Sequence, residues 1–298
     1  MSAEPNYDEL CTKLFKTFKG LGTDEKTITS VLATLTNEQI VRKLIPRYQT
    51  QQSKNFVQHL QSELSGNMKN LLSLVCTARY ETWARALDQQ TTNKRQPHTI
   101  TRFIALIDHQ DRFRILQQYQ AIFNTPIDNL LSKIKDVEIQ TYAKAVLLNE
   151  YEVTDDGINQ FCQDCKGSIT SQQLFEFLAC CDTKSWPKFT LKFKQVTSED
   201  FTTWTAKNFQ NQIQIINIHA KALENPVTII SELLYYSMKG AGTDDDTLQQ
   251  TTAIFRDYHW KDLPIVYKQF GDITKDFKSD LTGKYEECVL RLWGCVWF

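Results

Sequence analysis

The sequence predicts an all-α protein built from four copies of one helical unit. The first observation is that the segment KGLGTD at 19–24 recurs as KGAGTD at 239–244, 220 residues later. The second is an acid-and-glycine signature that follows each copy, SELSG at 62–66 and SDLTG at 279–283. The third is that apolar residues recur at helical spacing, while strand signals are scarce. Two separate signals in the same order at both ends of a chain indicate an internal repeat.

The repeat period follows from the distance between the two glycine motifs. A third of 220 is about 73, so two further units fit between the outer copies. Steps of that length from Gly20 reach Asn93 and Lys166, which lie in the loop-like segments 92–97 and 166–170. We therefore predict four repeats. Repeat I with a short N-terminal tail covers 1–77, repeat II 78–153, repeat III 154–225 and repeat IV 226–298.

Each repeat is predicted to contain about five short helices. Apolar residues three, four and seven positions apart form one face of a helix and predict its buried side. Such stripes are Leu10, Leu14, Phe18; Ile28, Val31, Leu32, Leu35; Met68, Leu71, Leu72, Val75; Ile230, Leu233, Leu234, Met238; and Tyr285, Cys288, Val289, Leu292.

The residues after each glycine pair predict where the next helix begins. Thr23 and Thr243 stand where an N-cap hydroxyl would accept the first free amides of the helix. Asp24, and Asp244 through Asp246, then place negative charge in the first turn, where the helix dipole favours it.

Composition excludes several classes of protein. The net charge of −1 does not suggest a polybasic nucleic-acid binder. No segment approaches the roughly 18 apolar residues that would span a bilayer. The first eight residues show neither a basic nor an apolar signal region, so we expect a cytoplasmic protein whose eight cysteines are reduced thiols.

No catalytic motif is present, and we expect a protein that is not an enzyme. GxxxxGK[ST] and GxSxG are missing, and the five histidines do not group with a serine or cysteine. A zinc site formed by Cys162, Cys165, Cys180 and Cys181 is a weak alternative, because the second pair is adjacent. Asp155-Asp156-Gly157 lacks the EF-hand pattern and is predicted to be a turn between repeats. Most tryptophans are expected in the core.

The glycine loops have the chemistry of a calcium site. Alternate glycines allow positive φ and let successive carbonyls point inward. Carbonyl oxygens are hard ligands that suit Ca²⁺. Glu63 and Asp280, each three residues before a glycine, are the candidate carboxylates. One carboxylate with a few carbonyls leaves positions open for water or a lipid phosphate, and predicts weak calcium affinity without lipid. A turn that needs glycine and binds nothing is the alternative.

With these residues the chain resembles the annexins over essentially its whole length. The resemblance implies a fourfold repeat of five helices forming a curved disc, with calcium loops on the convex face that docks on anionic phospholipid. It also implies the ligands. The first site would use the carbonyls of Phe18, Gly20 and Gly22 with Glu63. The last would use those of Met238, Gly240 and Gly242 with Asp280.

The sequence also departs from the annexin pattern. Repeat II has no glycine in its loop, although Asp136 and Glu138 lie near the expected acid, and repeat III keeps only Lys166-Gly167. We expect no site of this type in either. The step from Gly242 to Asp280 is 38 residues, against 41 from Gly22 to Glu63, which puts the geometry of Asp280 in doubt. This divergence and the short N-terminal tail are similar to the α-giardins, annexin-like proteins of a protist cytoskeleton.

The expected function is calcium-dependent binding to anionic membrane surfaces, with a link to cytoskeletal filaments. Leu21 and Ala241 at the loop tips, and Lys94 and Arg95 in the degenerate second loop, are the expected membrane contacts. Lys166 and Lys207 of repeat III are further basic residues of this kind, and ordinary solvated charge is the alternative for all four. A cytoskeletal scaffold that binds filaments or other partners without calcium is the alternative function. We expect a protein peripheral to membranes that does not bind nucleic acid.

Overall fold

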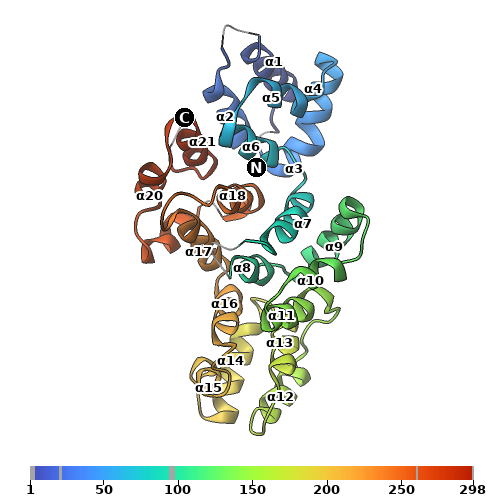
Figure 1. The fold of residues 1–298 in the computed structure, drawn as a ribbon, viewed down its shortest axis with the longest axis vertical. Helices are drawn as coiled ribbons and strands as arrows, with labels where there is room; N and C mark the ends of the chain where they lie inside the picture. Colours follow the sequence, from blue (N-terminus) through green and yellow to red (C-terminus); the bar gives the residue numbers. More distant parts are fainter. Residues whose placement is uncertain (1–3, 20–21, 94–97, 260, 297–298) are drawn as a thin grey trace. The chain divides into compact units, whose positions relative to one another are not determined.

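The fold was described from a computed structural model that covers residues 4–19, 22–93, 98–259 and 261–296. The described residues form α-helices with short π-helical and 3₁₀ segments, joined by turns, and contain no β-strand (Figure 1). This confirms the all-α prediction. The helices occur in four successive groups of about five, and the exact repeat boundaries remain a prediction.

The first group of helices ends at Val75. Its third helix, 37–52, is continuous in φ and ψ but contains a π-helical stretch, η1. The members are α1 (Tyr7–Thr17), α2 (Glu25–Ala33), α3 (Asn37–Gln39), η1 (Ile40–Leu44), α4 (Ile45–Gln52), α5 (Phe56–Glu63) and α6 (Gly66–Val75).

The second and third groups have five helices each. The second comprises α7 (Arg79–Gln90), α8 (Thr99–Ala105), α9 (His109–Phe123), α10 (Asp128–Lys133) and α11 (Val137–Leu148). The third comprises α12 (Asp155–Asp164), α13 (Ser171–Cys180), α14 (Ser185–Thr197), α15 (Phe201–Asn208) and α16 (Ile213–Glu224).

The fourth group has the same order with a short third helix. It comprises α17 (Pro226–Met238), α18 (Asp245–His259), α19 (Leu263–Val266), the 3₁₀ turn η2 (Tyr267–Gln269), α20 (Ile273–Asp280) and α21 (Gly283–Leu292).

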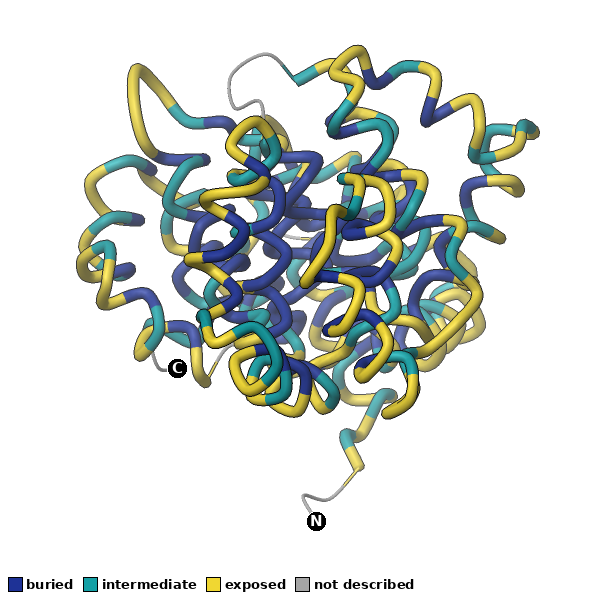
Figure 2. The backbone as a smooth tube through the Cα atoms, turned by 90° about the horizontal axis from the view of Figure 1, so that it is seen from below, coloured by how far each residue is buried: buried dark blue, intermediate teal, exposed yellow. Residues whose placement is uncertain are grey.

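The predicted apolar stripes are the buried faces of these helices. Ile28, Leu32, Leu71, Leu234 and Val289 are each completely shielded from solvent. Only Leu10 and Tyr285, among the stripe residues, are half-buried. Figure 2 shows buried and exposed segments alternating along the helices, as expected where each helix has one apolar face. Trp186, Trp204 and Trp293 are buried, and Trp260 and Trp297 lie outside the described residues.

Two compact units make up the chain, Met1–Trp83 with Leu233–Phe298 and Ala84–Glu232. The first unit brings the two ends of the sequence together. In it α2 packs against α21, and α6 packs against α18 and α21. The Arg256 guanidinium is buried there, with Nη2 donating to the Leu35 carbonyl at 2.9 Å and Nη1 to the Leu32 carbonyl at 3.4 Å. Both glycine motifs therefore belong to the same unit.

The second unit has its own core. In it α11 packs against α13, α12 against α14, and α8 against α16 and α11. The buried His219 of α16 joins three of these helices. Its Nε2 donates to the Leu178 carbonyl at 3.0 Å, and its Nδ1 accepts from the Tyr142 hydroxyl at 2.6 Å. A carbonyl can only accept, so Nε2 carries a proton. Burial lowers the pKa of His219 to about 4, so the ring is neutral near pH 7 and Nδ1 accepts from the Tyr142 hydroxyl.

One predicted turn is a helix start instead. Asp155 and Asp156 form the first turn of α12, and the Thr154 hydroxyl caps it by accepting from the Gly157 amide at 3.1 Å. The prediction of a turn at 155–157 was therefore wrong. A threonine cap followed by acids favours a helix N-terminus, and one glycine does not overcome it.

Candidate metal centres

The first glycine loop lies between α1 and α2. The side chain of Phe18, the C-cap of α1, is buried and its ring centroid lies 4.5 Å from that of His59. Gly22 has φ +91°, and a Cβ added to it would meet no atom within 4 Å. The backbone there is thus in a conformation that glycine favours and faces open space. Gly20 and Leu21 lie outside the described residues.

The candidate carboxylate approaches this loop from the end of α5. Glu63 is the last residue of α5, and its Oε2 accepts a hydrogen bond from the Thr23 hydroxyl at 3.1 Å. The same hydroxyl lies 3.4 Å from the Glu63 carbonyl oxygen. The structure therefore brings together Gly22 and Glu63, which are 41 residues apart in the sequence.

The last glycine loop is built in the same way between α17 and α18. Gly240 and Gly242 have φ +115° and +78°. The Asp244 amide donates to the Ser237 carbonyl at 2.6 Å, which closes the loop that follows Met238. Asp280 is the last residue of α20, and its Oδ2 accepts from the Thr243 hydroxyl at 2.5 Å.

The shorter spacing in repeat IV does not move Asp280 from the position that Glu63 takes in repeat I. Both carboxylates end an eight-residue helix, α5 or α20. Both precede by three residues a glycine with left-handed φ, +57° at Gly66 and +62° at Gly283. The difference lies in the middle of the repeat, where the third helix is long in repeat I and reduced to α19 and η2 in repeat IV. Asp280 and Glu63 therefore occupy equivalent helix-end positions in spite of the shorter spacing in repeat IV.

The predicted N-caps were wrong by one residue. Asp24 caps α2, and its carboxylate accepts from the Thr27 amide at 3.0 Å and the Thr27 hydroxyl at 2.6 Å. Those hydrogen bonds hold the pKa of Asp24 below its ordinary value. Asp244 makes the equivalent bonds to Thr247. Aspartate caps a helix as well as threonine does. The hydroxyls of Thr23 and Thr243 can therefore donate to the carboxylates of Glu63 and Asp280 instead of capping.

The donor set of both loops fits calcium. It offers backbone carbonyls beside glycines and one half-buried carboxylate, all oxygen. Within the described part of the chain, no three His, Cys, Asp or Glu side chains gather as a metal cluster. A calcium ion here would therefore be held by backbone carbonyls, the one carboxylate and ligands from outside the protein. The ligand roles of Phe18, Gly20, Gly22, Met238, Gly240 and Gly242 remain predictions.

In repeat II a lysine stands where the carboxylate stands in repeats I and IV. Lys133 is the last residue of α10, as Glu63 is of α5. Its Nζ lies 2.6 Å from Asp88 Oδ1 on α7, and the Tyr119 hydroxyl donates to the same oxygen at 3.0 Å. The Asp136 carboxylate caps α11 by accepting from the Glu138 and Ile139 amides. This corner therefore supplies its own cation, Lys133, which was not among the predicted residues. Counting three to four residues back from the fifth helix would have found it.

In repeat III an amide replaces the carboxylate. Asn208 ends α15, and its side chain donates to the Trp204 carbonyl of the same helix at 2.8 Å. Ile169 takes the place of the second glycine of the motif. The Thr170 hydroxyl caps α13 by accepting from the Gln173 amide and is not available to a carboxylate as Thr23 is. That repeats II and III lack a site of this type remains a prediction.

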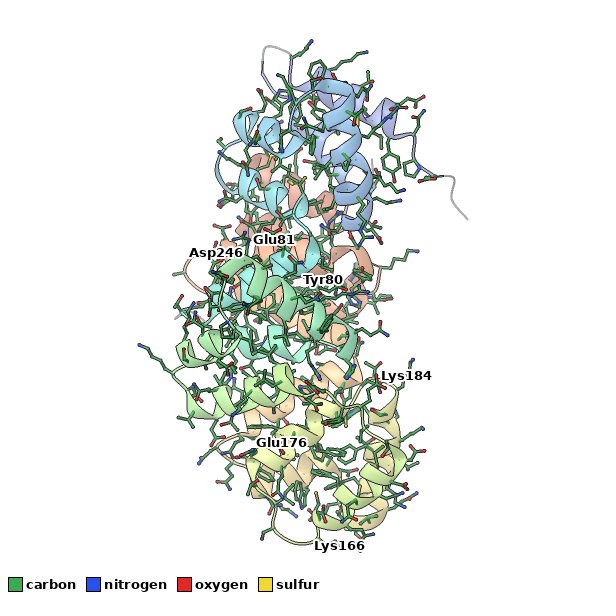
Figure 3. The ribbon with its side chains drawn as sticks, turned by 90° about the vertical axis from the view of Figure 1, so that its right-hand side faces the viewer. Tyr80, Glu81, Lys166, Glu176, Lys184 and Asp246 are labelled. Atoms are coloured by element: carbon green, nitrogen blue, oxygen red, sulfur yellow. The ribbon has the colours of Figure 1, made fainter. Side chains whose placement is uncertain are left out.

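The residues expected to touch a membrane are only partly described. Leu21, Lys94 and Arg95 lie outside the described residues. Ala241 is exposed in the last loop. Lys166 is exposed in the turn between α12 and α13, and Figure 3 labels it. Lys207 forms an ion pair with Glu199.

The cysteines are all free thiols. Burial raises the pKa of Cys162 to about 11 and that of Cys165 to about 12, so both are protonated near neutral pH. Cysteines bind zinc as thiolates, so nothing here favours the zinc alternative. Among the helices of the described residues, none is both long and apolar enough to cross a bilayer.

The sequence is similar to those of annexins. Residues 10–75 match the Annexin family model. Human annexin A7 is 24% identical over 305 residues, which cover 94% of this chain and 60% of that protein. Human annexin A5 is 26% identical over 313 residues, covering 97% of this chain and 95% of that one. The chain thus spans about 60% of the length of annexin A7.

Solved structures share the fold. The calcium-bound annexin (Sm)1 superposes with a TM-score of 0.86 at 14% identity, over 99% of this chain and 93% of that one. Calcium-bound alpha-1 giardin superposes with a TM-score of 0.78 at 14% identity, over 97% and 99%. At such identities these matches concern the fold alone. The family-model match lies in the first repeat, while the alignments and the shared fold extend along nearly the whole chain, so the chain is similar to the annexins throughout.

Proposed function

We propose that the protein binds calcium in the glycine loops of repeats I and IV and, through the bound ions, docks on anionic phospholipid. One observation carries the proposal. In both loops a carboxylate at the end of a helix accepts from the threonine that follows the second glycine, Glu63 from Thr23 and Asp280 from Thr243. The same arrangement is built twice from segments that are distant in the sequence. This favours a calcium site over a turn that needs glycine and binds nothing.

The chemistry supports a lipid as co-ligand. Calcium takes six to eight oxygens, and one carboxylate with a few carbonyls leaves positions open. Lipid phosphate oxygens would complete the shell, so calcium and membrane would bind together. The calcium-bound states of annexin (Sm)1 and alpha-1 giardin are consistent with this role for a shared fold. The loop carbonyls and the carboxylates of Glu63 and Asp280 would hold the calcium ion, which would supply positive charge to attract an anionic headgroup.

Basic and apolar residues that the sequence places in the interhelical loops would add to the attachment. Burying Leu21 in the interfacial region would contribute roughly 1.5–3 kcal/mol. Lys94 and Arg95 would each contribute about 1 kcal/mol near an anionic leaflet, and salt would screen this. The protein would be cytoplasmic, peripheral to membranes and without catalytic activity or nucleic-acid binding.

Co-sedimentation with vesicles of phosphatidylserine and phosphatidylcholine tests the proposal. Binding is expected in millimolar calcium and not in chelator, apart from a weak salt-sensitive fraction due to Lys94 and Arg95. Equal pelleting with calcium and with chelator, unaffected by salt, would contradict it. Leu21→Ala is expected to weaken vesicle binding without changing calcium affinity in the absence of lipid.

A link to cytoskeletal filaments is the second candidate function. Large apolar side chains that are exposed in the second unit, among them Val137, Tyr151 and Leu191, would support partner binding there. Pelleting with purified filaments in chelator tests it, and a protein that stays in the supernatant at all filament concentrations would exclude it.

A further inference from the structure

Two lysines share one aromatic ring beside the first glycine loop. Lys19 Nζ lies 4.3 Å from the centre of the Phe15 ring, and Lys54 Nζ lies 5.9 Å from it. Phe15 belongs to α1, Lys19 directly precedes the glycines, and Lys54 stands between α4 and α5. Both lysines are exposed, and no carboxylate of the described residues forms an ion pair with either ammonium. The ring attracts cations through its electron-rich face and so gathers two positive charges at one place.

The Phe15 ring is held by the helices of the first repeat. It meets the Tyr48 and His59 rings edge to face, with centroids 6.4 and 6.1 Å away. The Tyr48 hydroxyl is hydrogen-bonded to His59 Nδ1 at 2.8 Å, which ties α4 to α5. The His59 ring also lies 4.5 Å from that of Phe18, the predicted calcium ligand at the end of α1. The two ammonium groups therefore rest on the same helices that carry the first glycine loop and Glu63.

The helices around the ring carry charge of one sign. Residues 10–23 and 39–62, which form most of α1, η1, α4 and α5, contain seven basic residues and no aspartate or glutamate. The basic residues are Lys13, Lys16, Lys19, Arg42, Lys43, Arg47 and Lys54. The whole chain has a net charge of −1, so this concentration is local. A cluster of about four to eight basic residues on amphipathic helices is typical of surfaces that bind anionic or phosphorylated lipid headgroups.

The acids that flank these segments do not cancel the charge. Asp8 and Glu38 pair with the two arginines, and the five lysines form no ion pair with a described residue. Glu9 stands ten residues before Lys19, toward the other end of α1. Glu63, at the end of α5, is the candidate calcium ligand, and a bound ion would offset its charge. The surface beside the first glycine loop is therefore suited to an anion.

The fourth repeat lacks this pair of lysines. Lys239 Nζ lies 5.5 Å from the centre of the Tyr235 ring, which takes the place of Phe15 four residues before the motif lysine. The residue before the N-cap of the helix that ends in the carboxylate is Lys54 in repeat I and Gly271 in repeat IV. The second ammonium therefore belongs to repeat I alone.

We propose that Lys19 and Lys54, here named the lysine pair, bind the phosphomonoester of a lipid headgroup whose phosphodiester is held with calcium at the first glycine loop. This inference rests on the proposed function and names the lipid class that repeat I prefers. A phosphomonoester carries a charge of about −1.5 to −2 at pH 7 and matches two ammonium groups, whereas the carboxylate of phosphatidylserine matches one. The flexible stems of the lysines allow both Nζ atoms to reach the same group of oxygens.

Co-sedimentation in millimolar calcium tests the proposal with two kinds of vesicle of equal total charge. One contains phosphatidylserine and the other phosphatidylinositol 4-phosphate, each diluted in phosphatidylcholine. The protein is expected to bind the second kind about fivefold more tightly or better. Lys19→Gln with Lys54→Gln should abolish this preference and still pellet with phosphatidylserine vesicles. Lys54→Gln alone, which leaves the glycine motif unchanged, should reduce the preference about twofold or more.

The matched control removes two lysines from the fourth repeat. Lys239→Gln with Lys268→Gln loses the same charge from exposed positions and should keep the preference. If this control loses the preference as fully as the Lys19/Lys54 variant does, general charge explains the binding and the proposal is overturned. Soluble inositol 1,4-bisphosphate that binds the calcium-loaded protein as tightly as the vesicles do would also overturn it, because the ligand would then not be a lipid.

The outcomes separate this inference from the proposed function. Calcium-dependent pelleting with both kinds of vesicle at equal affinity overturns the inference and leaves the proposed function standing. A protein that pellets with neither kind in calcium contradicts the proposed function, and it overturns this inference as well, since phosphatidylinositol 4-phosphate vesicles should bind.

Discussion

The Thr243 hydroxyl donates to Asp280 Oδ2 at 2.5 Å, and across the same unit the Thr23 hydroxyl donates to Glu63 Oε2 at 3.1 Å. In each pair the threonine ends a glycine loop and the acid ends a short helix that arrives about 40 residues later. The hydroxyl thus fixes one oxygen of a carboxylate that would otherwise swing freely, and leaves the other oxygen for a cation.

Removing the charge of either carboxylate is expected to raise the calcium requirement for vesicle binding. Glu63→Gln and Asp280→Asn keep shape but lose the charge that attracts the ion, so a shift of about tenfold is expected for each. Because Asp280 takes the same helix-end position as Glu63, we now expect the two effects to be comparable. Calcium titrations of vesicle co-sedimentation measure the shift. The melting temperature in chelator should hardly change, and binding curves identical to wild type would remove these residues from the sites.

Lys133→Met is expected to destabilise the fold and leave calcium dependence untouched. The substitution leaves Asp88 with only the Tyr119 hydroxyl, which costs about 1 kcal/mol for a partly exposed pair. Thermal unfolding should shift down by a few degrees. Lys188→Met, which breaks the exposed pair with Asp155, is the control and should change little. An altered calcium requirement in Lys133→Met would mean that repeat II contributes to metal binding.

The folded protein should become less stable as the pH is lowered from 7 toward 4, because of His219. Burial lowers its pKa to about 4 in the folded protein, whereas the unfolded chain has the ordinary value near 6.5. Between those pH values the His219 side chain is protonated in the unfolded chain and neutral in the folded protein. The stability contributed by neutral His219 is therefore present above pH 6.5 and is lost as the pH falls toward 4.

Urea midpoints at pH 7 and pH 5 measure this effect. The loss at pH 5 is about 2 kcal/mol for a group of this kind. His219→Gln should be less stable at pH 7 but lose less between pH 7 and pH 5. His98 and His259, whose pKa values are also lowered by burial, remain in both proteins, so the difference reports His219. Parallel pH profiles would contradict the assignment.

Arg256→Met is expected to loosen the contact between the first and last repeats. The buried guanidinium donates to the Leu32 and Leu35 carbonyls and lies 3.3 Å from Asp257. Its removal leaves a buried carboxylate and two carbonyls without this donor, at a cost of about 2–4 kcal/mol. Chemical denaturation measures this. Arg42→Met, which removes a fully exposed ion pair with Glu38, should cost little, and similar midpoints for the two variants would disprove the role.

The sequence by itself determined the helices and their repetition. Apolar residues at positions such as 28, 31, 32 and 35 must share one side of a helix, and that side is buried. Glycine pairs followed by Thr-Asp marked the loops, because few other residues adopt positive φ. Local periodicity and backbone sterics need no knowledge of distant contacts.

The tertiary structure decided which distant residues meet. That Thr23 turns to Glu63 while Asp24 caps the helix depends on the position of α5, which no local rule gives. The ion pair of Lys133 with Asp88 depends equally on how helices far apart in sequence pack. Side-chain partners are selected by packing, and a linear pattern records only which residues are available for it.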